Sequence, residues 1–224
     1  MGRVLPILFN TDMVRAILDG RKTVTRRVIK PQLDACPSCM HMNVDYIYDS
    51  IAQRIYCARC GEPLQERKPL CRIGDILYVR ETFRPLSEHP AAGFEYAADW
   101  SPKYFENSKE PNCCNRGKWI SSIHMPKEAA RIWLKVTDVR VEWLQDITNE
   151  QILGEGANKA TINHLIKQLP EETEEYIRTA FLTEWSWLWD STIKKKDLAL
   201  YGWEANPWLW VIEFERCEKP ESEV

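Results

Sequence analysis

The sequence lacks any apolar run close to the roughly 20 residues that a bilayer-spanning helix needs. Its opening stretch, MGRVLPILFNTDM, holds only a short apolar segment and no small-residue cleavage site, so it does not resemble a signal peptide. Glycine and proline are modest in number, with 9 and 13 among 224 residues, which excludes collagen-like and low-complexity chains. We therefore expect a folded cytoplasmic protein with no membrane segment.

Net charge is small, at −3, but it is unevenly distributed along the chain. Positively charged residues are concentrated near the start of the chain, whereas residues 141–224 carry a net negative charge. A basic cleft can attract a polyanion even on an acidic protein, because the field in a cleft depends on nearby charge. A solvated strand edge is the alternative interpretation of the early basic residues, which are Arg3, Arg15, Arg21, Lys22, Arg26, Arg27 and Lys30.

Four of the eight cysteines form two CxxC pairs. Without an export signal, a disulfide framework is disfavoured. Each pair can present two thiolates from a tight turn, and two such turns complete a tetrahedral site with four sulfur ligands. We predict a structural zinc ion in a zinc-ribbon insertion over residues 34–66; two unrelated pairs of reduced thiols are the alternative. The predicted ligands are Cys36, Cys39, Cys57 and Cys60.

Hydrophobic periodicity predicts several strands and few helices. Helices are expected at 11–18, 148–154 and 171–190, the second with a capping box formed by Thr148 and Gln151. Residues 84–126 are expected to form a long loop containing one short strand, and residues 157–206 a helical insertion. The sequence thus predicts a single α+β domain over residues 1–224, built on a small mixed β-barrel. The expected strands are 4–9, 21–28, 74–83, 94–97, 131–143 and 207–215.

Four separated segments resemble the ASCH family, whose barrel is similar to the PUA domain of RNA-modifying proteins. The segment ILDGRKTVTRR at 17–27 resembles the family's GxKTxTxR signature, and GDILYVRET at 74–82 resembles its next strand. The other two are the strand at 131–143, with the helix that ends at Glu155, and the closing strand WVIEF at 210–214. The long form is similar to ASCH proteins encoded by phages and prophages. The resemblance implies a PUA-like mixed β-barrel with flanking helices and RNA or a modified nucleoside as partner.

One small bacterial member of the family is an amidohydrolase that removes the acyl group from N4-acetylcytidine with a Lys, a Thr and a Glu. Residue by residue, its motif corresponds to Lys22, Thr25 and Glu155. A threonine hydroxyl needs a base to become a nucleophile, and a partly neutral lysine can be that base. Nearby arginines would lower the pKa of Lys22, and Glu155 could orient the amine or carry the proton. Ordinary structural roles for all three residues are the alternative.

Further residues are candidates for nucleic-acid contact. Side chains at neighbouring strand positions point to opposite faces, so only one of Arg80 and Glu81 can face a cleft. A buried structural pair involving Glu81, and a structural role for His124, are the alternatives. Ten tryptophans can stack on bases or pack in the core. The candidate nucleic-acid contacts are Arg21, Arg26, Arg27, Arg80, Glu81 and His124.

These observations predict a protein directed at nucleic acid or nucleosides. The first hypothesis is an amidohydrolase acting on N4-acylated cytidine through Lys22, Thr25 and Glu155. The second is a non-catalytic RNA-binding module that uses the same basic cleft. The third is a ribonuclease, in which Lys22 and His124 would act on the 2′-hydroxyl. The predicted zinc does not depend on which hypothesis holds, because four protein ligands leave no open position for catalysis.

Overall fold

The computed structural model describes residues 2–32, 35–42, 44–64, 68–86, 93–100 and 118–221. Its contacts divide the chain into two compact units. Unit 1 comprises Met1–Gly20, Gly74–Val136 and Glu215–Val224, and unit 2 comprises Arg21–Ile73 and Thr137–Phe214. None of the helices in the described ranges is long and apolar enough to cross a membrane.

Unit 1 is built around a parallel pair of strands. β1 (Val4–Leu8) pairs in parallel with β6 (Ile76–Arg80), and β6 pairs antiparallel with the start of β9 (Trp133–Trp143). Helix α1 (Thr11–Leu18) follows β1; its N-cap is Asn10 rather than the adjacent threonine. The region expected as a loop, 84–126, contains most of strand β7 (Phe83–Pro85), strand β8 (Phe94–Tyr96) and the short helices Ala97–Asp99 and Ser122–His124, and a further short helix, Lys127–Ala129, follows it. Parts of that region, 87–92 and 101–117, lie outside the described residues.

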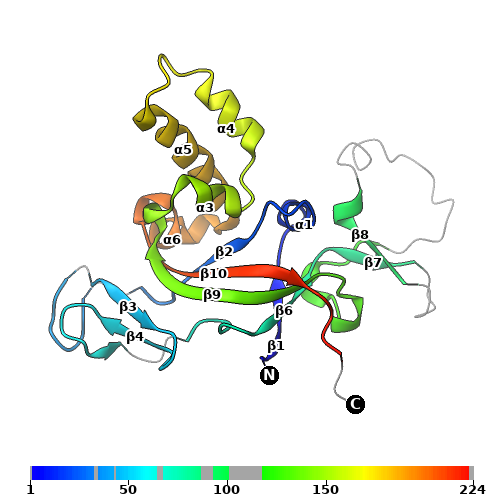
Figure 1. Ribbon diagram of the computed structural model, residues 1–224, viewed down its shortest axis with the longest axis horizontal. Helices are drawn as coiled ribbons and strands as arrows, with labels where there is room; N and C mark the ends of the chain where they lie inside the picture. Colours follow the sequence, from blue (N-terminus) through cyan, green and yellow to red (C-terminus); the bar gives the residue numbers. More distant parts are fainter. Residues whose placement is uncertain are drawn as a thin grey trace. The chain divides into compact units, whose positions relative to one another are not determined.

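Unit 2 contains the antiparallel pair of β2 (Val24–Val28) and β10 (Trp208–Cys217), with helices connecting the strands (Figure 1). A short helix, Leu144–Asp146, follows β9 and precedes α3 (Asn149–Gly154), which carries the expected capping box. α3 and α4 (Lys159–Ile166) both pack against α5 (Glu174–Thr192). Three short helices complete the unit: Lys195–Asp197, α6 (Leu198–Tyr201) and Trp203–Ala205. The helices of unit 2 share an apolar core with β10, formed by Leu144, Ile147, Ile152, Ala157, Ile162, Trp185, Trp189 and Leu209.

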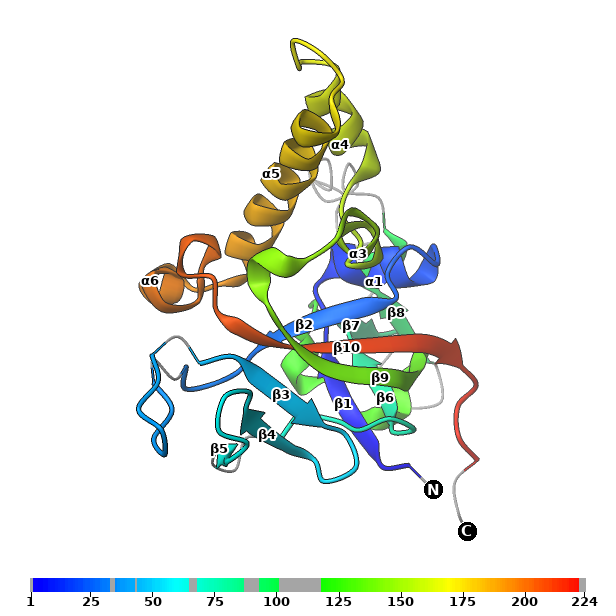
Figure 2. The ribbon, with the colours of Figure 1, turned by 60° about the vertical axis from the view of Figure 1, so that its left-hand side comes forward.

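The expected zinc ribbon is a small three-stranded sheet in unit 2 (Figure 2). β3 (Tyr46–Asp49) and β4 (Arg54–Cys57) form the hairpin, and β5 (Pro63–Leu64) adds to β4. Its aromatic side chains contact β10, where the Trp208 ring lies 4.5 Å from the Tyr46 ring and 4.2 Å from the Trp143 ring. Several tryptophans therefore pack within the fold and do not offer free stacking surfaces.

The main strands follow the order β1-β6-β9-β10-β2. Closure into a barrel requires the two edge strands to pair, but in the described residues β1 pairs only with β6 and β2 only with β10. The α+β class is confirmed. The described strands form an open five-stranded sheet, and not the closed barrel that the sequence predicts.

Candidate functional site

The segment between α1 and β2 is the first part of the site. Gly20 ends the helical turn with φ of 73°, a conformation that glycine adopts without strain. Residues 21–23 are not yet in the strand: the Thr23 N–H donates to the Gly154 carbonyl at 2.8 Å, and its carbonyl accepts from the Phe214 N–H at 2.9 Å. The start of β2 is thus fixed between the end of α3 and β10.

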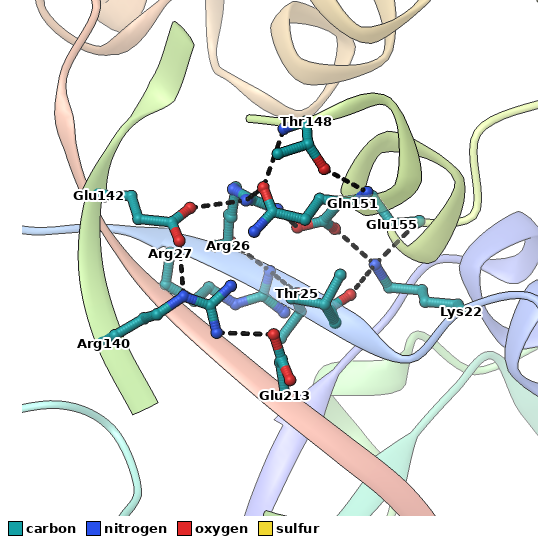
Figure 3. A network of polar contacts seen from close by, with 11 residues as sticks. Lys22, Thr25, Arg26, Arg27, Arg140, Glu142, Thr148, Gln151, Glu155 and Glu213 are labelled. Atoms are coloured by element: carbon teal, nitrogen blue, oxygen red, sulfur yellow. Dashed lines mark hydrogen bonds and ion pairs between the residues drawn. The ribbon is translucent and has the colours of Figure 1, made fainter. Parts of the chain in front are cut away.

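Lys22 reaches from this segment to the outer edge of β2. The Thr23 carbonyl points to β10, and successive carbonyls of a strand point in opposite directions, so the Val24 carbonyl points away from β10. There it accepts a hydrogen bond from the Lys22 Nζ at 2.8 Å. The same ammonium donates to Glu155 Oε2 at 2.7 Å and to the backbone carbonyl of Glu155 at 2.9 Å. Figure 3 shows the lysine meeting Glu155. Lys22 is 2% exposed and Glu155 4% exposed, so the ion pair is buried.

Glu155 is delivered by α3 and shared with a second cation. The Thr148 hydroxyl accepts from the Gln151 N–H, which fixes the start of the helix, and Glu155 follows its last turn as the C-cap. Arg26 Nη1 donates to Glu155 Oε1 at 3.1 Å, and Arg26 Nη2 donates to Gln151 Oε1 at 3.0 Å. One carboxylate therefore bridges two buried cations.

The network continues across β9 toward solvent (Figure 3). Arg26 Nη2 also donates to Glu142 Oε2 at 2.9 Å. Arg140 binds Glu142 and pairs with Asp138 at 2.7 Å and Glu213 at 2.6 Å. Burial opposes the charge of Arg140, but these carboxylates raise its pKa. Sequence reasoning missed this extension, although three charged residues spaced by two on one strand share a face.

Lys22 is electrostatically unusual. Burial is the largest influence and lowers the pKa of Lys22; Glu155 opposes this shift, and the neighbouring charges of Arg27 and Arg26 add to it. The net direction is downward, which favours the neutral amine more than in an ordinary lysine. A buried lysine with a lowered pKa beside a carboxylate can exchange protons.

Thr25 occupies a different face of β2. Strand alternation places it with Arg27 and opposite Arg26. The Thr25 hydroxyl accepts from Arg27 Nη1 at 3.0 Å, and the residue is 1% exposed. Burial lowers the pKa of Arg27, and Glu155 opposes that shift. The structure thus joins Lys22 and Glu155 directly and gives Thr25 a guanidinium partner.

Of the predicted nucleic-acid contacts in unit 2, only Arg21 is exposed, and its guanidinium donates to the Gly156 carbonyl at 3.3 Å. The Arg26 side chain is fully buried in its ion pairs, and Arg27 is half-buried. An open basic rim would need these guanidinium groups at the surface. Their role in binding phosphate stays a prediction.

The remaining candidates belong to unit 1. Glu81 is 1% exposed and receives two hydrogen bonds from Arg131, at 2.9 and 3.1 Å, as in the alternative of a buried pair. Burial raises the pKa of Glu81, and Arg131 opposes the shift. Arg80 donates to the Ile123 carbonyl, and His124 is exposed. Arg131 was not a sequence candidate, because nothing along the chain links it to Glu81.

The four predicted metal ligands lie together. Their sulfur atoms are all within 4.8 Å of one another, with Cys36 and Cys60 at 3.7 Å and Cys39 and Cys57 at 3.9 Å. A tetrahedral zinc ion with Zn–S bonds of about 2.3 Å separates its sulfurs by about 3.8 Å, so the site fits this ion. The backbone amide of Cys39 is the largest cause that lowers the pKa of the Cys36 thiol to about 7. For Cys60, the backbone amide of Glu62 acts in the same direction, but desolvation and the neighbouring cysteine thiols outweigh it and raise the pKa to about 12.

The two cysteine turns repeat one geometry. Met40 N–H donates to the Cys36 carbonyl at 2.8 Å, and Gly61 N–H donates to the Cys57 carbonyl at 2.9 Å. Met40 and Gly61, each following the second cysteine of its pair, have positive φ angles of 54° and 71°. Glycine at 61 is the residue expected for this conformation, whereas methionine at 40 gives no such signal in the sequence.

Comparison with known proteins does not identify a family for this chain. No family model, curated protein or solved structure matches the chain.

Proposed function

We propose that this chain is an ASCH-family protein with a PUA-like fold that hydrolyses N4-acylated cytidine at Lys22, Thr25 and Glu155. The observation that carries the proposal is the buried contact between Lys22 Nζ and Glu155 Oε2, at 2.7 Å. Burial lowers the pKa of Lys22, and the neutral amine that this shift favours is the form that can act as a base.

The reaction would proceed through an ester of Thr25. The hydroxyl oxygen attacks the acyl carbonyl carbon while its proton passes, directly or through one water, to the neutral amine of Lys22, which the movement proposed below would bring within reach. Arg27, which donates to that oxygen at 3.0 Å, stabilises the negative charge that develops on it. The bond from carbon to N4 breaks as N4 takes the proton from Lys22. Water then attacks the ester carbonyl as Lys22 accepts one of its protons, and the bond from carbon to the Thr25 oxygen breaks as Lys22 returns that proton to the oxygen, which releases the carboxylic acid and restores the hydroxyl.

Substrate entry requires movement, because Lys22, Thr25 and Glu155 are all nearly inaccessible. Arg21 and Thr23 are exposed on either side of Lys22 in the chain. We propose that the segment containing them shifts when the nucleoside binds. Arg21 would then lie beside the ligand, where it can contact a phosphate.

A non-catalytic RNA-binding module is the second candidate, and a specific observation favours it. Three acceptors surround the Lys22 Nζ and together satisfy the three hydrogens of a charged ammonium. Arg26 also donates a hydrogen bond to Glu155 Oε1 at 3.1 Å. If this arrangement persists when ligand binds, Lys22 cannot serve as a base, and RNA would contact only the exposed groups around it, such as Arg21.

One pair of assays separates the candidates. Purified protein is incubated with N4-acetylcytidine, and separately with labelled single-stranded RNA. Release of acetate supports the amidohydrolase, whereas retarded but intact RNA without acetate supports the binding module. Shortened RNA would support the ribonuclease hypothesis.

We also propose that Cys36, Cys39, Cys57 and Cys60 hold one structural zinc ion, which would fix the fold of the ribbon. The separation of the four sulfurs supports this assignment, as does the repeated backbone geometry of the two turns. Elemental analysis of protein purified without added metal should find about one zinc per chain. Well-ordered residues in the ribbon of a metal-free protein would contradict the proposal.

A further inference from the structure

One face of the ribbon hairpin is directed at β10. Tyr46 and Tyr48 are two residues apart on β3, so their side chains share a face. The Tyr46 ring stacks on Trp208 at 4.5 Å, and the Tyr48 ring meets Trp210 edge-on at 5.0 Å. The strand partner of Tyr46 is Cys57, one of the four metal ligands. The cysteine centre and the aromatic contacts are therefore parts of one small sheet.

Trp208 anchors the ribbon to the main sheet through its polar groups as well. Its indole Nε1 donates to the Val44 carbonyl at 3.0 Å, within the ribbon. Its backbone N–H donates to Gln32 Oε1 at 2.8 Å, and its carbonyl accepts from the Ile29 N–H at 3.1 Å. Movement of the ribbon would disturb contacts at the end of the pair formed by β10 and β2.

The contacts continue from Trp210 to the site. Trp210 lies opposite Arg27 in the antiparallel register of β10 and β2, and Ile212 lies opposite Thr25. Directly opposed residues share a face, with their Cβ atoms about 4.5–5.5 Å apart, so the side chains of Trp210 and Arg27 leave the same face of the sheet next to each other. Arg27 in turn donates to the Thr25 hydroxyl at 3.0 Å.

We infer that the metal-bound ribbon positions the Thr25 hydroxyl, through the contacts of Tyr48 with Trp210 and of Trp210 with Arg27. The four thiolates hold the hairpin in its fold, and the hairpin holds the two tyrosines against β10. Tyr48, Trp210 and Arg27 are positioning residues, through which the ribbon acts on Thr25. The expected effect on turnover rests on the proposed hydrolase, whereas the positioning itself does not.

Methyl and indole NMR resonances of the zinc-loaded protein test the inference without any substrate. The substitution Tyr48→Leu removes the ring that contacts Trp210, whereas Tyr48→Phe retains that ring. Tyr56→Leu is the matched control, because Tyr56 pairs with Ile47 on the other face of the same hairpin. We expect Tyr48→Leu to shift the Thr25 methyl resonance at unchanged zinc content, and Tyr48→Phe and Tyr56→Leu to leave it in place. Removing zinc with a chelator should shift the same resonance.

Turnover provides a separate readout. If the proposed hydrolysis occurs, Tyr48→Leu should lower kcat by about ten- to a hundredfold with little change in KM, since misplacing a reacting group by about 1 Å has an effect of that size. A shifted Thr25 resonance in a protein that releases no acetate would support the positioning and contradict the proposed hydrolase. An unmoved Thr25 resonance in Tyr48→Leu and in chelated protein, with the ribbon signals changed, would overturn the inference.

Discussion

Glu155 balances the charges at the centre of the site. Its two carboxylate oxygens meet different cations, Lys22 at 2.7 Å and Arg26 at 3.1 Å. Both cationic side chains are fully buried, so neither can exchange its partner for water. Removing one partner of a buried pair leaves an uncompensated charge, which is far more destabilising than the loss of a surface pair.

Glu155→Gln should therefore lower the free energy of unfolding by about 3–5 kcal/mol. Lys22→Met should have a smaller effect, because Glu155 keeps its pair with Arg26. Urea unfolding followed by circular dichroism measures both variants. Glu172→Gln, at an exposed position, is the control and should change stability by less than about 0.5 kcal/mol. Equal, small losses in all three variants would show that the network contributes little.

The pKa of Lys22 makes a prediction about pH. If the neutral amine is the base, the rate of acetate release rises as Lys22 loses its proton with increasing pH. Because burial lowers the pKa of Lys22, this rise should have its midpoint below the ordinary lysine value of 10.5. The pH profile of kcat/KM for N4-acetylcytidine measures it. A rate that is flat over the whole range, or that rises only above 10.5, would argue against Lys22 as the base.

The sequence identified some of these residues and missed others for a physical reason. Lys22 and Glu155 were matched to a motif, and their contact is present. The partners of Arg26 were not predictable, since Glu142 follows it by 116 positions and only folding brings the two together. Burial of Arg26 was equally hidden, because a basic run looks the same whether its charges are solvated or paired.

At the scale of elements, α3 positions Glu155 through the cap at its start. The capping box that the spacing of Thr148 and Gln151 predicts is present. Gln151 also accepts a hydrogen bond from Arg26, so this cap belongs to the ion-pair network. A substitution in the first turn of the helix should therefore alter the hydrogen bonds of the ion-pair network.

Thr148→Ala should lower the free energy of unfolding by about 1 kcal/mol, the usual value of an N-cap. Thr148→Ser retains the hydroxyl and should restore most of the loss. Thermal unfolding compares the two variants with the parent protein. A Thr148→Ser variant that is as unstable as Thr148→Ala would show that the threonine methyl, and not the cap, stabilises this turn.

The zinc ribbon should depend on its metal. Cys60→Ser removes one ligand, and because metal binding is coupled to local folding, amide protection in β3 and β4 should fall. Hydrogen exchange measures this loss, and β6 provides the internal reference because it lies in unit 1. Unchanged protection in the ribbon of a zinc-free Cys60→Ser protein would contradict the structural role of the metal.

Element boundaries show where local pattern stops being informative. The alternation in β9 and the cysteine spacing predicted their elements well, since both signals are contained in a few residues. The strand expected from residue 21 begins at Val24 instead, because Thr23 is hydrogen-bonded to Gly154 at the end of α3. Barrel closure was also expected, but it depends on pairing between edge strands, which no local pattern specifies.

At the scale of the whole molecule, ion pairs engage several of the basic residues near the start of the chain. Arg3 is paired with Asp75, Arg15 with Asp12, and Lys22 and Arg26 with Glu155. The positive charge available to a polyanion is therefore smaller than the sequence indicates. A nucleoside substrate needs less of that charge than a long RNA does, which favours the proposed hydrolase over the binding module.

Acetate release from N4-acetylcytidine by Thr25 variants tests the central claim most directly. Thr25→Val keeps the shape of the side chain and removes the proposed nucleophile, Thr25→Ser retains it, and Thr137→Val removes an exposed hydroxyl on β9. The account predicts release by the parent protein, by Thr25→Ser and by Thr137→Val, and a loss of at least about a hundredfold in Thr25→Val. Equal rates in Thr25→Val and the parent protein, with both folded, would contradict it.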